Sequence, residues 1–221
     1  RGGVDRTQGR RHRIERMKEF WNDRYGAPEY AYGREPNVFF ARCLEAYPVS
    51  GSILLPAEGE GRNAVHAARQ GLQVTACDIS EAGRDKAMTL AAEHGVQLRY
   101  EVGDIRTLDL DREHYHAAAL IYAHFAPEVR AGIHQRVVDH LAPGGLLFLE
   151  AFSKQNLPLR LADPRVGGPD RVDMLHSTEQ VLEDFAGLEV LELQEMGIDL
   201  REGPYHQGRA RVVRFVGRKA P

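Results

Sequence analysis

The sequence is short of the residues and runs that mark several classes of protein. Its 221 residues include only two cysteines, Cys43 and Cys77, and neither stands at the spacing of a metal or redox motif. No apolar run approaches the ~20 residues that a membrane-spanning helix needs, and the first residues have no apolar signal-peptide core. We therefore expect a protein of the reducing cytoplasm, without a membrane partner.

The sequence also has no large excess of positive or negative charge. The formal net charge is -3 and the isoelectric point is near 6.4, which does not favour nucleic acid as a partner. Positive charge gathers only in residues 1–18, where a flexible basic tail is the simplest interpretation and contact with RNA or an acidic membrane the alternative. The arginines of this tail include Arg6, Arg10, Arg11, Arg13 and Arg16.

The remaining length, residues 19–221, fits one α/β domain better than two small domains. From residue 52 onward, short apolar runs alternate with helical periods, which is typical of a mostly parallel sheet covered on both faces. We expect parallel strands at residues 52–56, 72–77, 97–102, 117–122 and 146–152.

The end of the domain has a different pattern. Residues 188–194 and 209–216 have no helical period between them, so we expect an antiparallel pair of strands. The predicted fold class is therefore α/β, a Rossmann-like three-layer sandwich whose seven-stranded sheet is mostly parallel with an antiparallel last strand.

A loop with two glycines follows the first expected strand. Gly59, Gly61 and Ala64 match the loose dinucleotide-binding pattern, and the glycines allow a tight turn and close approach to a ligand. Glu58 and Glu60 lie where a pyrophosphate would bind, and like charges ~4 Å apart repel by ~4 kcal/mol at an effective dielectric of about 20. The loop thus favours S-adenosylmethionine, which has a sulfonium and no phosphate, over NAD, unless both glutamates point to solvent.

Acidic residues also end the next two expected strands. Asp78, nineteen positions after Gly59, can accept hydrogen bonds from both hydroxyls of a ribose. Its alternative role is a turn aspartate before Ser80. Asp104 is placed to accept an adenine amino group while Ile105 covers the base, because the ends of parallel strands converge on one crevice.

Further motifs accompany this crevice, and the combination resembles the class I S-adenosylmethionine-dependent methyltransferases over residues 20–219. The closest branch is that of the tellurite-resistance and thiopurine methyltransferases. The resemblance implies transfer of a methyl group to a small-molecule acceptor, with S-adenosylhomocysteine as product. The motifs are Phe20-Trp21-Asn22-Asp23-Arg24-Tyr25, Tyr32-Gly33-Arg34-Glu35-Pro36-Asn37, Glu58 to Ala64, Ala76-Cys77-Asp78-Ile79-Ser80, Tyr122-Ala123-His124, Pro143-Gly144-Gly145 and Glu150-Ala151-Phe152.

The resemblance also implies which residues hold the cofactor. Tyr122 would form the floor near the sulfonium, while Trp21 and Tyr25 would close over the cofactor or pack an N-terminal helix on the domain. The residues implied at the methionine end, the ribose and the adenine are Ala57, Glu58, Gly59, Gly61, Arg62, Asn63, Asp78, Ile79, Asp104 and Ile105.

Two positions depart from the family pattern near the methionine ammonium. Leu55 replaces the acidic residue that usually ends the first strand, and Ala57 replaces the first glycine. We expect Glu58 to supply the missing charge.

The acceptor side gives weaker signals. Positioning alone can contribute ~7–11 kcal/mol to catalysis, so a soft nucleophile such as a thiol or a selenium or tellurium oxyanion needs no strong base. No residue is therefore assigned as catalytic. One candidate at the acceptor is His124, after the fourth strand. The others are His206 and Arg209, in the loop that enters the last strand, which resemble the His and Arg that the tellurite-resistance branch places by its acceptor. The alternatives are a structural histidine and a solvated hairpin tip, and no metal site is expected.

Other functions stay open at this point. An NAD-dependent oxidoreductase and a non-catalytic module that binds S-adenosylmethionine both fit the glycine loop, and RNA methylation would use the basic tail. Residues 121–124 lack the motif of DNA-amine methyltransferases. We also expect residues 157–173 to form a mobile loop over the acceptor, and the protein to be a monomer or weak homodimer.

Overall fold

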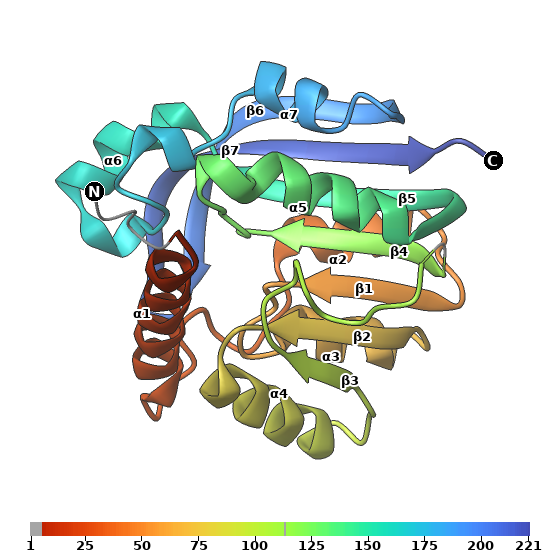
Figure 1. The fold of residues 1–221 in the computed structure, drawn as a ribbon, viewed down its shortest axis with the longest axis horizontal. Helices are drawn as coiled ribbons and strands as arrows, with labels where there is room; N and C mark the ends of the chain where they lie inside the picture. Colours follow the sequence, from red (N-terminus) through yellow and green to blue (C-terminus); the bar gives the residue numbers. More distant parts are fainter. Residues whose placement is uncertain (1–5, 113) are drawn as a thin grey trace.

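Within residues 6–112 and 114–221, which the computed structural model describes, seven strands form one sheet in the order β3-β2-β1-β4-β5-β7-β6 (Figure 1). The first five strands are parallel to one another, and β7 is antiparallel to both β5 and β6. The predicted fold class is confirmed. The strands are β1 (Ser52–Pro56), β2 (Gln73–Asp78), β3 (Arg99–Val102), β4 (Tyr115–Ile121), β5 (Leu141–Phe152), β6 (Leu188–Glu202) and β7 (His206–Lys219).

The last two strands are longer than the sequence predicts. Their register runs without a gap from the pair of Leu200 with Gly208 to the pair of Glu202 with His206, which leaves only residues 203–205 as a turn. The prediction that His206 and Arg209 lie in a loop is therefore wrong, because both belong to β7. Glycine and charged residues interrupt the alternation of apolar and polar residues in these segments, so the sequence does not indicate the full length of the two strands.

Helices cover both faces of the sheet, and Figure 1 shows α5 in front of it and α2 and α3 behind it. No helix of the described ranges has both the length and the apolar character needed to cross a membrane. The helices are α1 (Arg6–Gly26), α2 (Val38–Ala46), α3 (Arg62–Arg69), α4 (Glu81–Glu93), α5 (Pro127–His140), α6 (Leu157–Ala162) and α7 (Thr178–Asp184).

Each face of the sheet carries its own hydrophobic core. Successive residues of a strand point to opposite faces, so Leu54 of β1 packs in the core of α5 and α7. Its neighbours Ile53 and Leu55 pack with α2, α3 and α4. Because β1 is buried on both faces, the strand is apolar without alternation.

Two segments predicted as irregular contain helices. Residues 6–18, expected within a flexible tail, form the first half of α1, while residues 1–5 lie outside the described part. Residues 157–173, expected as a loop, include α6 and a 3-10 turn at Pro164–Val166, since Val166 packs into a small core with Phe152 and Val212. The flexibility of both segments stays a prediction.

Helix α1 lies at the carboxyl ends of the parallel strands, where the arrowheads of β1, β2 and β4 point in Figure 1. Ser80, the N-cap of α4, joins α1 to the rest of the domain. The Ser80 hydroxyl accepts from Gly83 N at 3.0 Å and donates to Asn22 Oδ1 of α1 at 2.7 Å. Asn22 Oδ1 also accepts from Ala82 N at 3.2 Å.

We predict that Ser80→Ala lowers the free energy of unfolding by about 2 kcal/mol, because it removes a helix cap and a bond to α1 together. The matched control is Ser177→Ala, which removes only the cap of α7 and should cost about 1 kcal/mol. Urea denaturation measures both. Equal losses would contradict the link through Asn22.

Candidate functional site

Two residues with a strained backbone follow the carboxyl ends of the central strands β1 and β4. Strand β1 has β2 on one side and β4 on the other, so the order of strands reverses there, and α/β folds bind ligands at such a point. Ala57 follows β1 and Tyr122 follows β4, and both have φ of 53°, a left-handed value that costs ~1–3 kcal/mol for residues other than glycine. Strain of this kind gathers at functional sites.

Glu58, the next residue of the loop, caps helix α3. Its Oε1 accepts hydrogen bonds from Asn63 N at 2.9 Å and Ala64 N at 2.7 Å. Burial raises the pKa of Glu58 to about 7, although these bonds and the charge of Arg62 act against the rise. One carboxylate oxygen is thus committed to the first turn of α3.

Glu60 is directed away from the crevice. Its Oε1 pairs with Lys86 Nζ at 2.8 Å and its Oε2 accepts from Ala31 N at 2.8 Å. Neither glutamate of the loop is therefore free in solvent. Because Lys86 balances Glu60, the repulsion of a phosphate by this loop rests on Glu58 alone.

The two glycines of the loop allow close packing as well as a turn. A Cβ atom at Gly59, where φ is 61°, would lie 2.6 Å from the Tyr25 hydroxyl. One at Gly61, where φ is 86°, would lie 2.4 Å from Ala87 Cβ of α4. The loop therefore has no room for side chains at either position.

Asp78, at the end of β2, is 8 % exposed and holds the loop by its backbone. Its Oδ2 accepts from Gly59 N at 3.0 Å and its Oδ1 from Ser80 N at 2.9 Å. Burial raises the pKa of Asp78 to about 6 against these hydrogen bonds. The backbone of Ile79 also bonds to this carboxylate, and since a carboxylate has about four acceptor positions, capacity remains for a ligand hydroxyl.

Aromatic residues of α1 cover this loop. Trp21 and Tyr25 stack with ring centres 5.3 Å apart, and Tyr25 is buried against Gly59. Tyr100, which sequence reasoning missed, donates its hydroxyl to Gly59 O at 2.6 Å. The packing role predicted for Trp21 and Tyr25 is present, and a covering role over a ligand stays a prediction.

The residues predicted at the adenine are partly engaged. Asp104 Oδ1 accepts from Arg106 Nε at 2.8 Å, and Oδ2 accepts from the same nitrogen at 3.0 Å. Ile105 is buried in the core of α5 and α7. An adenine amino group at Asp104 would therefore share the carboxylate with Arg106.

A largely buried carboxylate connects the loop to the hairpin of β6 and β7. Glu202 Oε2 lies 3.1 Å from Arg62 Nη2 and 3.1 Å from His206 Nδ1. Burial alone would raise the pKa of Glu202, but the hydrogen bond from His206 and the charge of Arg62 outweigh it and lower the pKa. His206 in turn packs its ring 4.6 Å from that of Tyr122. No motif in the sequence around Glu202 indicates this role, so sequence reasoning missed the residue.

The other acceptor candidates lie differently. His124 Nδ1 faces Met174 O at 2.9 Å and its Nε2 accepts from Phe152 N at 3.2 Å, so the main chain occupies both ring nitrogens. Burial lowers the pKa of His124 to about 4. Arg209 is exposed, whereas His206 is buried, as expected for strand residues of opposite parity. Of these three candidates, His206 is the one whose ring contacts the ring of Tyr122 in the described structure.

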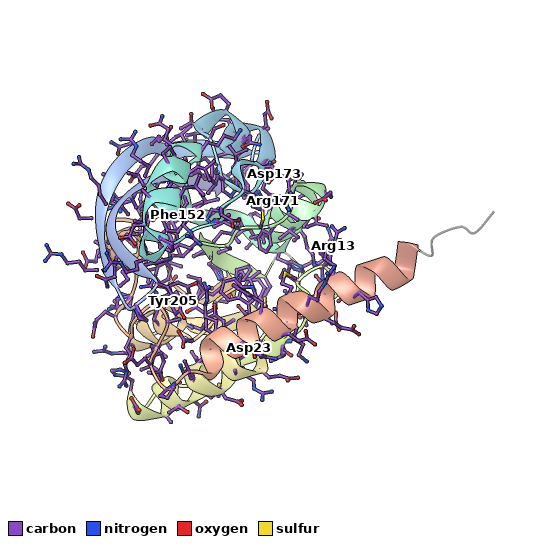
Figure 2. The ribbon with its side chains drawn as sticks, turned by 90° about the vertical axis from the view of Figure 1, so that its left-hand side faces the viewer. Arg13, Asp23, Phe152, Arg171, Asp173 and Tyr205 are labelled. Carbon is purple, nitrogen blue, oxygen red and sulfur yellow. The ribbon has the colours of Figure 1, made fainter. Side chains whose placement is uncertain are left out.

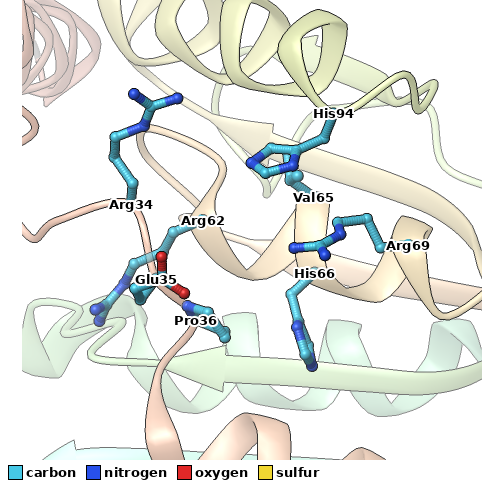
Figure 3. Close-up of a pocket in the computed structure, with 8 residues that line it drawn as sticks. All are labelled: Arg34, Glu35, Pro36, Arg62, Val65, His66, Arg69 and His94. Carbon is cyan, nitrogen blue, oxygen red and sulfur yellow. The ribbon is translucent and has the colours of Figure 1, made fainter.

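Two clefts occur in the part of the chain described. The first, here the α3 cleft, has a volume of about 290 Å³, with Arg62 and Glu35 on one side and His66, Arg69 and His94 on the other (Figure 3). The second, the hairpin cleft, of about 240 Å³, lies between α1, α6 and the turn at residues 203–205. Figure 2 views this side, where α1 crosses the molecule and Tyr205 lies near its C-terminal end. No group of side chains that could hold a metal ion occurs in the part of the chain described.

Comparisons with known proteins agree with this geometry. Residues 53–145 match the family model described as a methyltransferase domain, a span that contains the strained loop, Asp78 and Tyr122. A search of the curated proteins finds no match to the sequence.

Solved structures share the whole fold. A structure described by the conversion of a disulfide bond into a thioacetal group during echinomycin biosynthesis has a TM-score of 0.76 at 18% identity, over 92% of this chain and 92% of that chain. An S-adenosylmethionine-dependent methyltransferase of Methanosarcina mazei gives 0.67 at 17%, over 84% and 99%. TehB of Haemophilus influenzae gives 0.64 at 14%, over 91% and 66%. The fold is thus the Rossmann-like fold of methyltransferases.

We predict that Ala57→Gly raises the free energy of unfolding by about 0.5–1 kcal/mol, because relief of the left-handed strain exceeds the entropic cost of glycine. Gly61→Ala is the matched control and should lower it by about 1–3 kcal/mol, since the new methyl group meets α4. Denaturant titration of both variants measures the difference. A destabilised Ala57→Gly variant would contradict the strain.

Proposed function

We propose that this protein binds S-adenosylmethionine in the crevice after β1, β2 and β4 and transfers its methyl group to a small-molecule acceptor. The observation that carries the proposal is Asp78, a buried carboxylate hydrogen-bonded to the strained glycine loop at the point where strand order reverses. The methyltransferase-domain match over residues 53–145 and the fold support it.

The proposed binding residues follow the crevice from one end to the other. The backbone of the loop and the second oxygen of Glu58 receive the methionine end, Asp78 receives the ribose hydroxyls, and Tyr122 borders the reacting methyl group. The full proposed set is Trp21, Tyr25, Ala57, Glu58, Gly59, Gly61, Arg62, Asn63, Asp78, Ile79, Asp104, Ile105 and Tyr122.

Bound there, S-adenosylmethionine would supply a methyl group activated by its sulfonium, with S-adenosylhomocysteine as the product. The protein then has to orient the acceptor and exclude water, and the stacked rings of Trp21 and Tyr25 supply an apolar cover. His124 is held by the main chain through both nitrogens and cannot serve as a base without breaking those bonds. This favours an acceptor that needs no strong base, such as a thiol or a selenium or tellurium oxyanion.

The only tryptophan of the chain, Trp21, reports on the crevice. We predict that S-adenosylhomocysteine changes its fluorescence saturably, and that Asp78→Ala weakens the affinity by about a hundredfold, because charge-assisted hydrogen bonding to the ribose is lost. Asp23→Ala is the control, since Asp23 is exposed on the same helix.

An unchanged affinity in Asp78→Ala would contradict the proposal. NAD binding with no response to S-adenosylhomocysteine would instead indicate an oxidoreductase. Binding without turnover of any thiol, selenite or tellurite acceptor would indicate a module that only binds the cofactor.

The raised pKa of Asp78, about 6, predicts a pH dependence of binding. Ribose hydroxyls donate better to the ionised carboxylate, so affinity for S-adenosylhomocysteine should rise as pH increases through 6. Below the pKa it should fall about tenfold per pH unit. The measurement is a fluorescence titration from pH 5 to pH 8.

Two variants separate the titrating groups. Asp78→Asn should remove the dependence near pH 6. Glu58→Gln removes the other raised carboxyl of the loop, whose pKa is about 7 and which receives the methionine end in this proposal, so it should weaken binding above pH 7 while the rise near pH 6 remains. The assignment fails if Glu58→Gln flattens the profile and Asp78→Asn does not.

A further inference from the structure

The hairpin cleft lies between α1, α6 and the turn at residues 203–205. Arg24 of α1, Arg160 of α6 and Tyr205 of the hairpin turn line it, together with Tyr32 and Gly167. The cleft is formed where the N-terminal helix meets the segment after β5. It therefore exists only when both are folded onto β6 and β7.

Two cations in this cleft have no carboxylate partner among residues 6–112 and 114–221. Arg24 donates to the Tyr32 hydroxyl at 3.0 Å and lies over the Tyr205 ring at 4.3 Å. Arg160 donates through Nε to Gly168 O at 3.0 Å. By contrast, Arg165 on the same cleft pairs with Asp163 at 2.8 Å. The cleft thus has positive charge that its own acids do not balance.

The acids of the adjoining segments are committed elsewhere. Asp163 pairs with Arg165, and Glu202 lies between Arg62 and His206. Both arginines are only partly exposed, and guanidinium groups bind carboxylate and phosphate oxygens in pairs of hydrogen bonds. The chemistry of the cleft is therefore that of a site for a small anion.

The cleft also touches the reaction centre proposed above. Gly167, with φ of 87°, packs so closely that a Cβ there would lie 2.4 Å from His206 Cδ2. The Tyr32 ring lies 4.3 Å from the His206 ring, and the His206 ring lies 4.6 Å from that of Tyr122. A molecule in the cleft would thus lie against Tyr32 and Gly167, which both pack on His206, and the His206 ring in turn contacts Tyr122.

We infer that the hairpin cleft holds the methyl acceptor and that the acceptor is a small molecule with an oxyanion group, bound by Arg24 and Arg160. The inference rests on the proposed function and assigns the charge to these residues instead of to the exposed Arg209. The group shared by the possible acceptors is a carboxylate, a phosphate or a similar oxyanion, next to the atom that is methylated.

The test uses the full chain saturated with S-adenosylhomocysteine and three probes of similar size, namely benzoate, phenyl phosphate and neutral benzamide. Calorimetry should show at least one anion binding about tenfold or more tightly than benzamide, because only anions form charge-assisted bonds to the arginines. The preferred anion identifies the oxyanion group. Arg24→Gln and Arg160→Gln should each reduce that preference about tenfold.

Matched controls come from both clefts. Arg165→Gln removes a cation that Asp163 already neutralises, and Arg69→Gln removes one from the α3 cleft, so both should keep the preference. Arg24→Lys retains charge and should recover part of the loss. The inference is overturned if benzamide binds as tightly as both anions, if neither anion binds, or if Arg69→Gln is the variant that loses binding.

Failure of this inference differs from failure of the proposed function. Each sample is first titrated with S-adenosylhomocysteine through Trp21 fluorescence. If that ligand binds while the anions show no preference, only the acceptor assignment is wrong. If that ligand does not bind, the proposed function itself is wrong.

Discussion

The carboxylate of Glu202 connects the two halves of the candidate site. It lies between Arg62, at the first turn of α3, and His206, at the start of β7, and Arg62 also donates to Tyr32 O at 2.9 Å. Removal of one partner from a buried ion pair typically costs ~3–5 kcal/mol, because the other charge is left without compensation. Glu202 and its partner Arg62 therefore hold three segments at fixed distances from one another: the glycine loop, the segment before α2 and the hairpin.

The strained backbone at the strand ends is held by its neighbours. Ala57 and Tyr122 adopt left-handed conformations at the ends of two adjacent strands, and the surrounding contacts fix them there. Tyr122 N bonds to Glu150 O at 2.7 Å, and its ring stacks on Phe152 at 4.7 Å. Rigid strands thus position an otherwise unfavourable backbone, as a preorganised site requires.

Much of the fold follows from local pattern, whereas much of the site does not. Periodicity predicts the parallel strands, and the capping residues Ser80 and Ser177 mark two helix starts correctly. The partnership of Arg62 with Glu202 spans 140 positions, so no window of sequence can indicate it. The role of His124 depends on main-chain atoms at Phe152 and Met174, which carry no sequence signature.

Helix α1 contributes to both proposed ligand sites from a single turn. Trp21 and Tyr25 lie over the glycine loop, while Arg24 lines the hairpin cleft, and residues spaced by three and four positions share one helix face. A helix that contacts two ligands through one turn cannot lift from one without loosening its hold on the other. In the proposed arrangement, a movement of α1 would therefore change access to both sites at once.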